Sequence, residues 1–438
     1  HNHRQETSSQ SSQFQAGRSP EDMEQNIRQR VPEIIRRRRL GIDVSLADRL
    51  TDVFVAAFGN EFFAHQRQYT DGVSGRTKWE HPLIDDLLKS EVAETGVVEM
   101  LELARYLETF ANDRAVATVL DGLRAPLQYK NSFFQLAMAF RLSRFCGEVT
   151  LEPKTSSGFA DICFSFRGQV CVAECYHLKA TFMDFMGRVE LGLTDYLFGL
   201  VPRGQKYSYF ITLGELLTPS RLSALKRECK RVADTLKSNG GCRRLEMVVG
   251  NHRVDIHDIT DLKEDPDFPA GATRPRRLDE ADASYFQSQI PGDNIFEAMA
   301  TLPPPERQSR VFYKREYEHK WPNGPMSTLW NKLSRKMSQT RTDDGATTRA
   351  LFVEMPSFGP RVDAPERKGI PTSHRKIQEY AVRTFERFGF LLIATRWMTQ
   401  DRRFMYEGSL LTGKKEHAVP HEFIELFNKA ELQNPLMK

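Results

Sequence analysis

The segment that most constrains the fold of this chain runs from Gly158 to Lys179 and has the pattern of a β-hairpin. Two runs rich in Phe, Val, Ile and Cys flank the pair Arg167-Gly168, which is typical of a tight turn with positive φ. With these residues in the turn, counting outward along both strands places Asp161 opposite Glu174. Their Cβ atoms are then expected about 5 Å apart, and like charges so placed are unfavourable unless one is protonated or a cation lies between them.

The two faces of this hairpin differ in polarity. The face opposite the acid pair is apolar and consists of Ile162, Phe164, Phe166, Cys171, Ala173 and Cys175. A hairpin with one apolar face and an Asp/Glu pair on the other could hold a divalent metal ion, because carboxylate oxygens are the ligands that hard cations prefer. The alternative is a solvated polar face that carries two unrelated acids.

The amino-acid composition is compatible with several classes of globular protein. The chain of 438 residues is long enough for two or three domains or one elaborated core, and its 40% hydrophobic content supports a buried core. A net charge of +4 does not mark a strongly basic nucleic-acid binder, although it permits a local basic face. The six cysteines form no Cys-x-x-Cys pair. We expect a cytoplasmic protein with reduced thiols and no signal peptide or membrane segment.

The pattern along the chain predicts α/β architecture, a mixed sheet flanked by helices. We expect a disordered tail over 1–20, a helical N-terminal region over 21–125, the first part of the core over 126–254, a Pro-rich irregular insertion over 255–325, and completion of the core with a C-terminal tail over 326–438. The insertion is expected to hold at most a short helix around residues 294–300. Four consecutive arginines, Arg36 to Arg39, indicate either a solvated helix face or a contact with phosphate.

The order of a helix with Gln135, a strand, then Asp161 and Glu174 on two further strands resembles the PD-(D/E)XK nuclease superfamily. That family carries Asp-(x)n-Glu-x-Lys on this hairpin, often with Glu or Gln on the preceding helix. The resemblance covers residues 130–250 and, more loosely, 327–397. It implies a restriction-endonuclease-like fold and a magnesium-dependent endonuclease that hydrolyses phosphodiester bonds, with DNA as the expected nucleic acid.

The chain departs from the family at Tyr176, where the family has Lys. Tyr cannot supply a cation to the developing phosphorane charge. Lys179 is one substitute, although in an extended strand it faces away from the acids. Lys336 is the better candidate, because Lys332, Lys336 and Gln339 lie at i, i+4 and i+7 and so share one face of a predicted helix over 327–340. The alternative for that face is an ordinary exposed basic stripe.

The resemblance also implies what each residue of the site would do. Asp161, Glu174 and the backbone carbonyl of Cys175 would hold Mg²⁺ or Mn²⁺. Gln135 would hold a water or a further metal position, and Tyr176 could hydrogen-bond the phosphate or the water.

A competing interpretation is a catalytically inactive module that keeps the nuclease fold and binds nucleic acid or a protein partner. The missing lysine at position 176 motivates it. The N-terminal helices or the insertion over 255–325 would then contact a partner, for instance within a defence or mobile-element complex.

Overall fold

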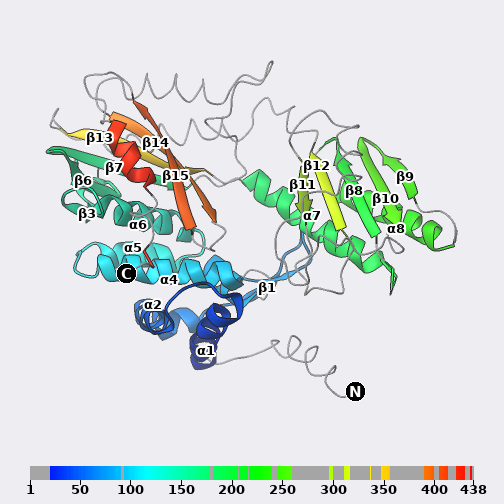
Figure 1. The fold of residues 1–438 in the computed structure, drawn as a ribbon, viewed down its shortest axis with the longest axis horizontal. Helices are drawn as coiled ribbons and strands as arrows, with labels where there is room; N and C mark the ends of the chain where they lie inside the picture. The colour runs from blue at the N-terminus through cyan, green and yellow to red at the C-terminus, as the bar shows by residue number, and fades with distance from the viewer. Residues whose placement is uncertain are drawn as a thin grey trace. The chain divides into compact units, whose positions relative to one another are not determined.

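The computed structural model describes residues 20–89, 93–156, 158–177, 181–202, 204–205, 207–215, 217–238, 244–258, 295–298, 310–315, 336, 347–355, 389–398, 404–412, 421–429 and 435–436. The chain divides into two compact units (Figure 1). The first unit contains His1–Tyr69, Trp79–Lys179 and Leu329–Lys438. The second unit contains Thr70–Lys78 and Ala180–Thr328.

Helices of the first unit account for most of the N-terminal part, as the apolar spacing predicts. They are α1 (Pro20–Arg38), α2 (Val44–Ala64), α3 (Pro82–Leu88), α4 (Ala93–Thr109), α5 (Val116–Arg124), α6 (Tyr129–Ser143) and α12 (His421–Asn428). Helix α2 begins where Asp43 accepts a hydrogen bond from the backbone N–H of Leu46 at 3.0 Å, a typical N-cap contact. The arginine run is exposed, at the last turn of α1 and just beyond it.

A six-stranded mixed sheet forms the other layer of the first unit. Its strands are β3 (Val149–Leu151), β6 (Ile162–Phe166), β7 (Gln169–His177), β13 (Thr348–Met355), β14 (Gly389–Met398) and β15 (Phe404–Thr412), in the order β15-β14-β13-β7-β6-β3. Strand β13 runs parallel to both β7 and β14, and the other neighbours are antiparallel. The predicted mixed sheet flanked by helices is confirmed at this level. Two short strands, β4 (Lys154–Thr155) and β5 (Gly158–Phe159), pair beside it.

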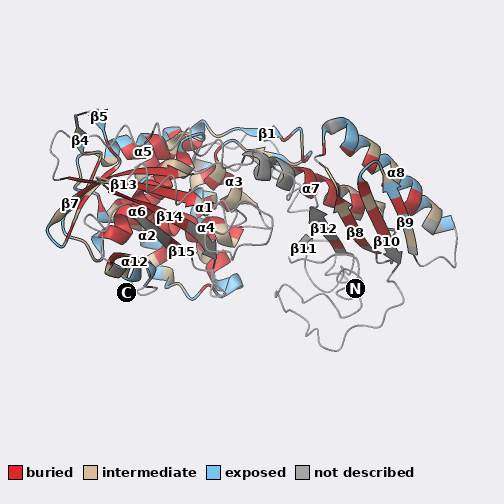
Figure 2. Ribbon diagram, turned by 90° about the horizontal axis from the view of Figure 1, so that it is seen from above, coloured by how far each residue is buried: buried red, intermediate tan, exposed pale blue. Residues whose placement is uncertain are grey.

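The core of the first unit lies between this sheet and its helices. All six residues of the predicted apolar hairpin face are buried there, together with side chains from α1 to α6 (Figure 2). Helix α12 contributes Phe423, whose ring centroid lies 5.3 Å from that of Phe166 and 5.5 Å from that of Phe390. The N-terminal helices are therefore part of the same hydrophobic core as the sheet and not a separate domain.

The second unit has a sheet of its own. Its elements are α7 (Thr181–Leu200), β8 (Tyr207–Leu213), α8 (Pro219–Ser238), β9 (Arg244–Val249), β10 (His252–Asp258), β11 (Ile295–Ala298) and β12 (Arg310–Arg315). The strand order is β11-β12-β8-β10-β9, and residues such as Leu193, Tyr209 and Val254 form a second buried cluster.

This arrangement corrects part of the predicted organisation. The apolar pattern predicts strands over 207–213 and 244–250 within the first part of the core over 126–254, but these strands pair within the second unit. The segment 255–325 is not wholly irregular, because it completes β10 and contains β11 and β12, and the helix predicted around residues 294–300 is a strand. The reason is burial: Val254 and Ile256 alternate with polar residues along β10 and need the second core to cover them.

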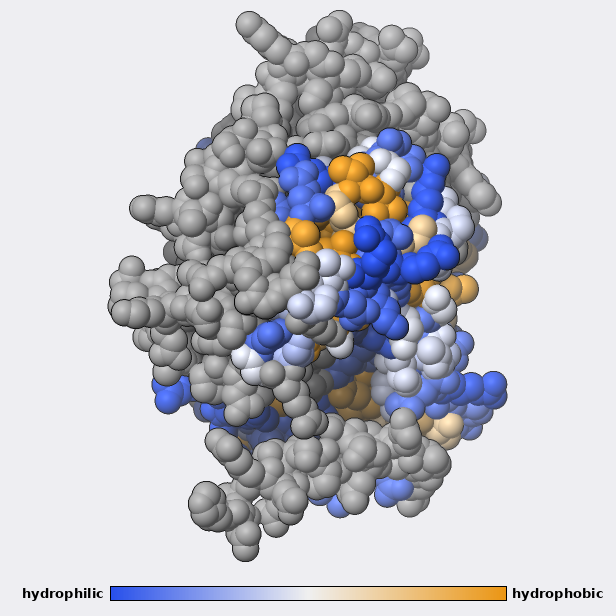
Figure 3. Space-filling view, turned by 90° about the vertical axis from the view of Figure 1, so that its right-hand side faces the viewer, coloured by the Kyte–Doolittle hydropathy of each residue, from blue (hydrophilic) through white to orange (hydrophobic). Residues whose placement is uncertain are grey.

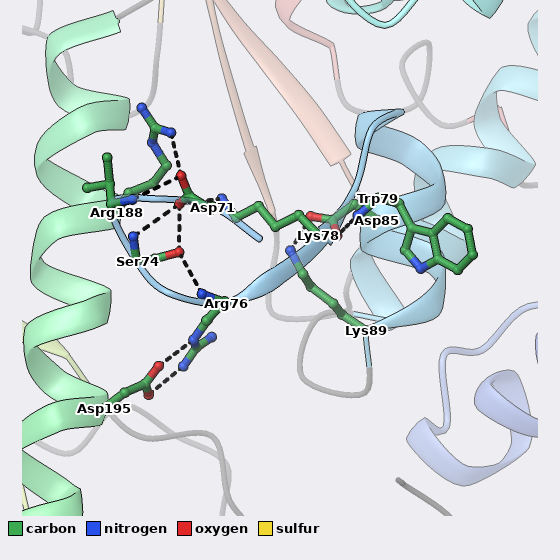
Figure 4. A network of polar contacts seen from close by, with 10 residues as sticks. Asp71, Ser74, Arg76, Lys78, Trp79, Asp85, Lys89, Arg188 and Asp195 are labelled. Carbon is green, nitrogen blue, oxygen red and sulfur yellow. Dashed lines mark hydrogen bonds and ion pairs between the residues drawn. The ribbon is translucent and has the colours of Figure 1, made fainter. Parts of the chain in front are cut away.

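A small hairpin lies in the segment around residues 68–79. Gly72 and Gly75 predict a loop over 69–78, and the structure adds two short strands, β1 (Gln68–Thr70) and β2 (Thr77–Trp79), whose intervening tip belongs to the second unit. In that unit Asp71 accepts from Ser74 and lies 2.9 Å from Nη1 of Arg188 on α7, while Arg76 pairs with Asp195 (Figure 4). Burial raises the pKa of Asp71, but hydrogen bonds from Ser74 and Val73 and the charge of Lys78 lower it to about 2.

The surface drawn in Figure 3 mixes hydrophilic residues with a small apolar patch. No helix among the described residues is both long enough and apolar enough to cross a membrane.

Candidate active site

The β6–β7 hairpin has the register that the sequence predicts. Arg167 and Gly168 form its turn with φ values of 52° and 80°, a conformation typical of two-residue hairpins. Cys163 pairs with Val172. The ladder ends one step further, at the pair Ile162 and Ala173, and Asp161, the residue just before β6, donates its backbone N–H to the carbonyl of Ala173 at 3.1 Å. The two acids therefore meet across the hairpin, on the face opposite the apolar core.

Asp161 is held in place by the neighbouring strand. Its Oδ2 accepts a hydrogen bond from the backbone N–H of Cys175 at 2.6 Å. Burial raises the pKa of Asp161, while the charge of Lys336 and the hydrogen bonds from Cys175 and Glu174 oppose that rise. Asp161 therefore lies close enough to Glu174 for the two carboxyl groups to influence each other, and the charge of Asp161 raises the pKa of Glu174.

Glu174 is the most buried acid of the site, with a side chain only 1% exposed. Burial raises its pKa to about 8, and the negative charge of Asp161 adds to the rise. Oε2 accepts from Nζ of Lys336 at 2.9 Å. Oε1 is buried and has no hydrogen-bond donor among the residues described above. A proton or a cation between the carboxylates would satisfy this oxygen.

Lys336 reaches the acid pair from a distant part of the sequence. Burial alone would lower the pKa of its amine, but the charges of Asp161 and Glu174 outweigh burial and raise it. The structure thus brings the preferred lysine candidate to the acid pair. Lys179 and Gln339, which the sequence also offers as polar side chains for this site, lie outside the described residues.

Gln135 on α6 lies beside the acid pair and organises it. Its Nε2 donates to the backbone carbonyl of Asp161 at 2.9 Å and to Oε1 of Glu152 at 2.7 Å. The resemblance implies that Gln135 holds a water or a metal position, and the structure gives its amide these two protein acceptors.

Glu152 is a site residue that the sequence analysis missed. It has a positive φ of 48°, directly after β3, and its backbone N–H donates to the carbonyl of Asp161 at 3.1 Å. Burial raises its pKa, and so does the charge of Asp161. The available signal was an acid directly after a strand and shortly before the hairpin, which a search for the family's motif overlooks.

The remaining candidates flank Glu174 on β7. Tyr176 is buried and points to the same side of the strand as Glu174, because the two are two residues apart. Cys175 points into the hydrophobic core and contributes only backbone groups near the acids.

The site suits a cation in charge but supplies few protein ligands. The carboxyl groups of Glu152, Asp161 and Glu174 lie near a single ammonium, that of Lys336. Each of the three carboxyl groups has a raised pKa, so additional positive charge at the site would be stabilising. Within the described part of the chain, however, no three His, Cys, Asp or Glu side chains come together to ligate a metal. A Mg²⁺ ion would therefore depend on Asp161, Glu174, the carbonyl of Cys175, waters and substrate oxygens, a ligand set that is common for this ion.

Comparisons of the chain with family models, with curated proteins and with solved structures found no match.

Proposed function

We propose that the first unit is a metal-dependent nuclease with a restriction-endonuclease-like fold. The supporting order is α6 with Gln135, strand β3, and then the two acids on the β6–β7 hairpin, followed by the parallel strand β13. The proposed reaction is hydrolysis of a phosphodiester bond, with DNA as the expected substrate.

The observation that carries this proposal is the contact between Lys336 and Glu174. It supplies a cation at the acid pair although the family's lysine position holds Tyr176. An acid pair with one half-buried ammonium suits phosphoryl transfer, since negative charge increases on the phosphate oxygens in the transition state.

The roles follow from the contacts. Asp161 and Glu174 would hold Mg²⁺ or Mn²⁺, a divalent ion that activates water and offsets phosphate charge when bound. Lys336 would donate to a phosphate oxygen, once its bond to Glu174 loosens as the carboxylate engages the cation. Gln135 keeps Asp161 and Glu152 fixed by donating to both. Tyr176 would hydrogen-bond the phosphate or the attacking water.

The direct test is a cleavage assay on DNA and RNA substrates with Mg²⁺ or Mn²⁺, using the wild type, Asp161→Asn and Glu174→Gln. We expect cleavage by the wild type and a loss of at least about 100-fold in each variant, the effect typical of removing an electrostatic contact in a transition state. Full activity in both variants would reject the proposal.

A second candidate is a module that binds nucleic acid without cutting it. It is favoured by the absence of a three-side-chain ligand set among the described residues and by the bond that already occupies Oδ2 of Asp161. Calorimetric titration with Mn²⁺ separates the two. Binding that is lost in Asp161→Asn supports the nuclease, whereas no binding together with DNA affinity that Asp161→Asn leaves unchanged supports the module.

A further inference from the structure

Helix α8 of the second unit is strongly basic. Its 20 residues include six Lys or Arg and two Asp or Glu, which gives the helix a net charge of +4. The whole chain of 438 residues has the same net charge of +4, so the rest of the chain is neutral overall. The excess positive charge of the protein is therefore concentrated on this one helix.

One face of α8 is buried and the opposite face is exposed (Figure 2). The buried face has apolar residues at spacings of three and four, and these pack in the core of the second unit: Leu222, Leu225, Cys229 and Val232. The exposed face carries hydroxyl and basic side chains, namely Ser220, Ser223, Arg227, Lys230 and Arg231. Because the apolar face is already covered, the helix offers charge and hydrogen-bond donors to a partner rather than apolar surface.

Two cations at the middle of this face are available to an anion. Arg227 and Lys230 are both exposed, and at a spacing of three residues they are neighbours on the helix surface. Within the described ranges neither side chain has a hydrogen-bond or ion-pair partner. Arg231 lies 2.8 Å from Glu228, but its side chain is 67% exposed, and ion pairs in such a setting are weak. Arg231 can therefore exchange its partner for a stronger anion.

The chemistry of this face fits a nucleic-acid backbone. Phosphate oxygens accept a large share of the hydrogen bonds in protein–DNA complexes, and Arg, Lys and Ser are among the usual donors. Protein–protein interfaces are instead depleted in Lys and are centred on aromatic residues, and α8 contains no aromatic residue. A helix that lies on a membrane inserts its apolar face, and that face of α8 is covered by the second core.

We propose that the exposed face of α8, with Arg227 and Lys230 at its middle, binds the phosphate backbone of the nucleic acid on which the chain acts. The inference rests on the proposed function, because it assigns part of the same substrate to the second unit. Contacts to phosphate groups do not depend on base sequence. The second unit therefore raises the affinity for the substrate and does not select a sequence through this helix.

The experiment measures binding to the intact chain as a function of salt. The parent is the Asp161→Asn protein in EDTA, which prevents cleavage. It is titrated into a fluorescein-labelled DNA duplex, and into single-stranded DNA and RNA of the same sequence, and binding is followed by anisotropy between about 0.1 and 0.5 M KCl. Vesicles that contain phosphatidylserine and a labelled polyglutamate peptide test a membrane and an acidic protein as alternative partners.

Into this parent we introduce Arg227→Gln together with Lys230→Gln. The matched control is Arg36→Gln together with Arg37→Gln, which removes the same charge from exposed arginines of α1. The single variants Arg227→Gln and Lys230→Gln are measured as well. Because all four side chains are exposed, we expect equal unfolding midpoints in urea for every variant.

For the double variant in α8 we expect binding to the duplex about 30-fold weaker at about 0.15 M salt. The slope of log association constant against log salt should become shallower by about 1.8, since each lost phosphate contact removes about 0.9. Each single variant should give about half of this change in slope, and the α1 control should change it much less.

An unchanged slope in the α8 double variant would overturn the inference and leave the nuclease proposal standing. An equal loss in the α1 control would also overturn it, because total charge and not this helix face would then be responsible. Binding of vesicles or polyglutamate by a parent that binds no nucleic acid would overturn it as well. A wild type that cuts no nucleic acid, together with the expected loss in the α8 variant, would overturn the nuclease proposal and support the binding surface.

Discussion

Replacing Glu174 with Gln should stabilise the metal-free protein at alkaline pH even though it removes a proposed catalytic group. The pKa of Glu174 rises from an ordinary 4.5 to about 8 through burial and the charge of Asp161. A carboxyl whose pKa is raised on folding contributes stability below about 4.5 and loses it as the pH rises through about 8. At about 1.4 kcal/mol per pH unit, the cost of ionising Glu174 in the folded protein is at most about 5 kcal/mol.

The assay is urea unfolding in EDTA at pH 5 and pH 9, for the wild type and Glu174→Gln. The neutral amide keeps an oxygen for Lys336, so the two proteins should be nearly equally stable at pH 5. At pH 9 the variant should be more stable by a few kcal/mol. Because other buried acids such as Glu102 titrate in both proteins, only the difference between the proteins is interpreted. Glu61→Gln, on the exposed surface of α2, is the matched control.

The reasoning is refuted if the difference between wild type and Glu174→Gln is the same at both pH values. It is also refuted if the variant is less stable than the wild type at pH 9.

Three further predictions concern the same unit. Lys336→Met should reduce cleavage at least about 100-fold while Lys336→Arg retains part of it, as measured by initial rates on the substrate that the wild type cuts. The affinity for Mn²⁺, measured by calorimetry, should rise with pH up to about 8, because the ion displaces the proton held by Glu174. An affinity that does not change with pH would contradict this prediction. Phe423→Ala should lower the free energy of unfolding by about 3–5 kcal/mol, because the Phe423 ring packs against Phe164, Phe166 and Phe390. A loss below about 1 kcal/mol would place α12 outside the core.

Local patterns proved reliable where the interactions are local. The turn pair at Arg167 and Gly168 and the alternation along both strands predict the hairpin register, because a side-chain period of two leaves only one register that buries the apolar face. The position of Asp161 beside Glu174 follows directly. The apolar pattern also predicts a helix between Asn131 and Gly147 and strands over 207–213 and 390–397, and α6, β8 and β14 lie close to these ranges.

Assignments that depend on distant contacts were less successful. Strands β8 and β9 have the same local pattern as core strands, yet they pair in a second sheet, and periodicity does not state which sheet a strand joins. Glu152 was missed for a related reason. Its place in the site depends on a single residue with positive φ and on Gln135 reaching across from α6.

The sequence alone therefore determined the hairpin and its facing acids, because a tight turn and a two-residue period set the pairing of neighbouring strands. Only the tertiary structure decided that Lys336, 162 residues from Glu174, supplies the cation at this pair, and that His177 meets Glu354 across two parallel strands. Parallel strands and distant helices are joined by burial of their apolar faces, and that packing depends on the whole chain rather than on any short stretch of it.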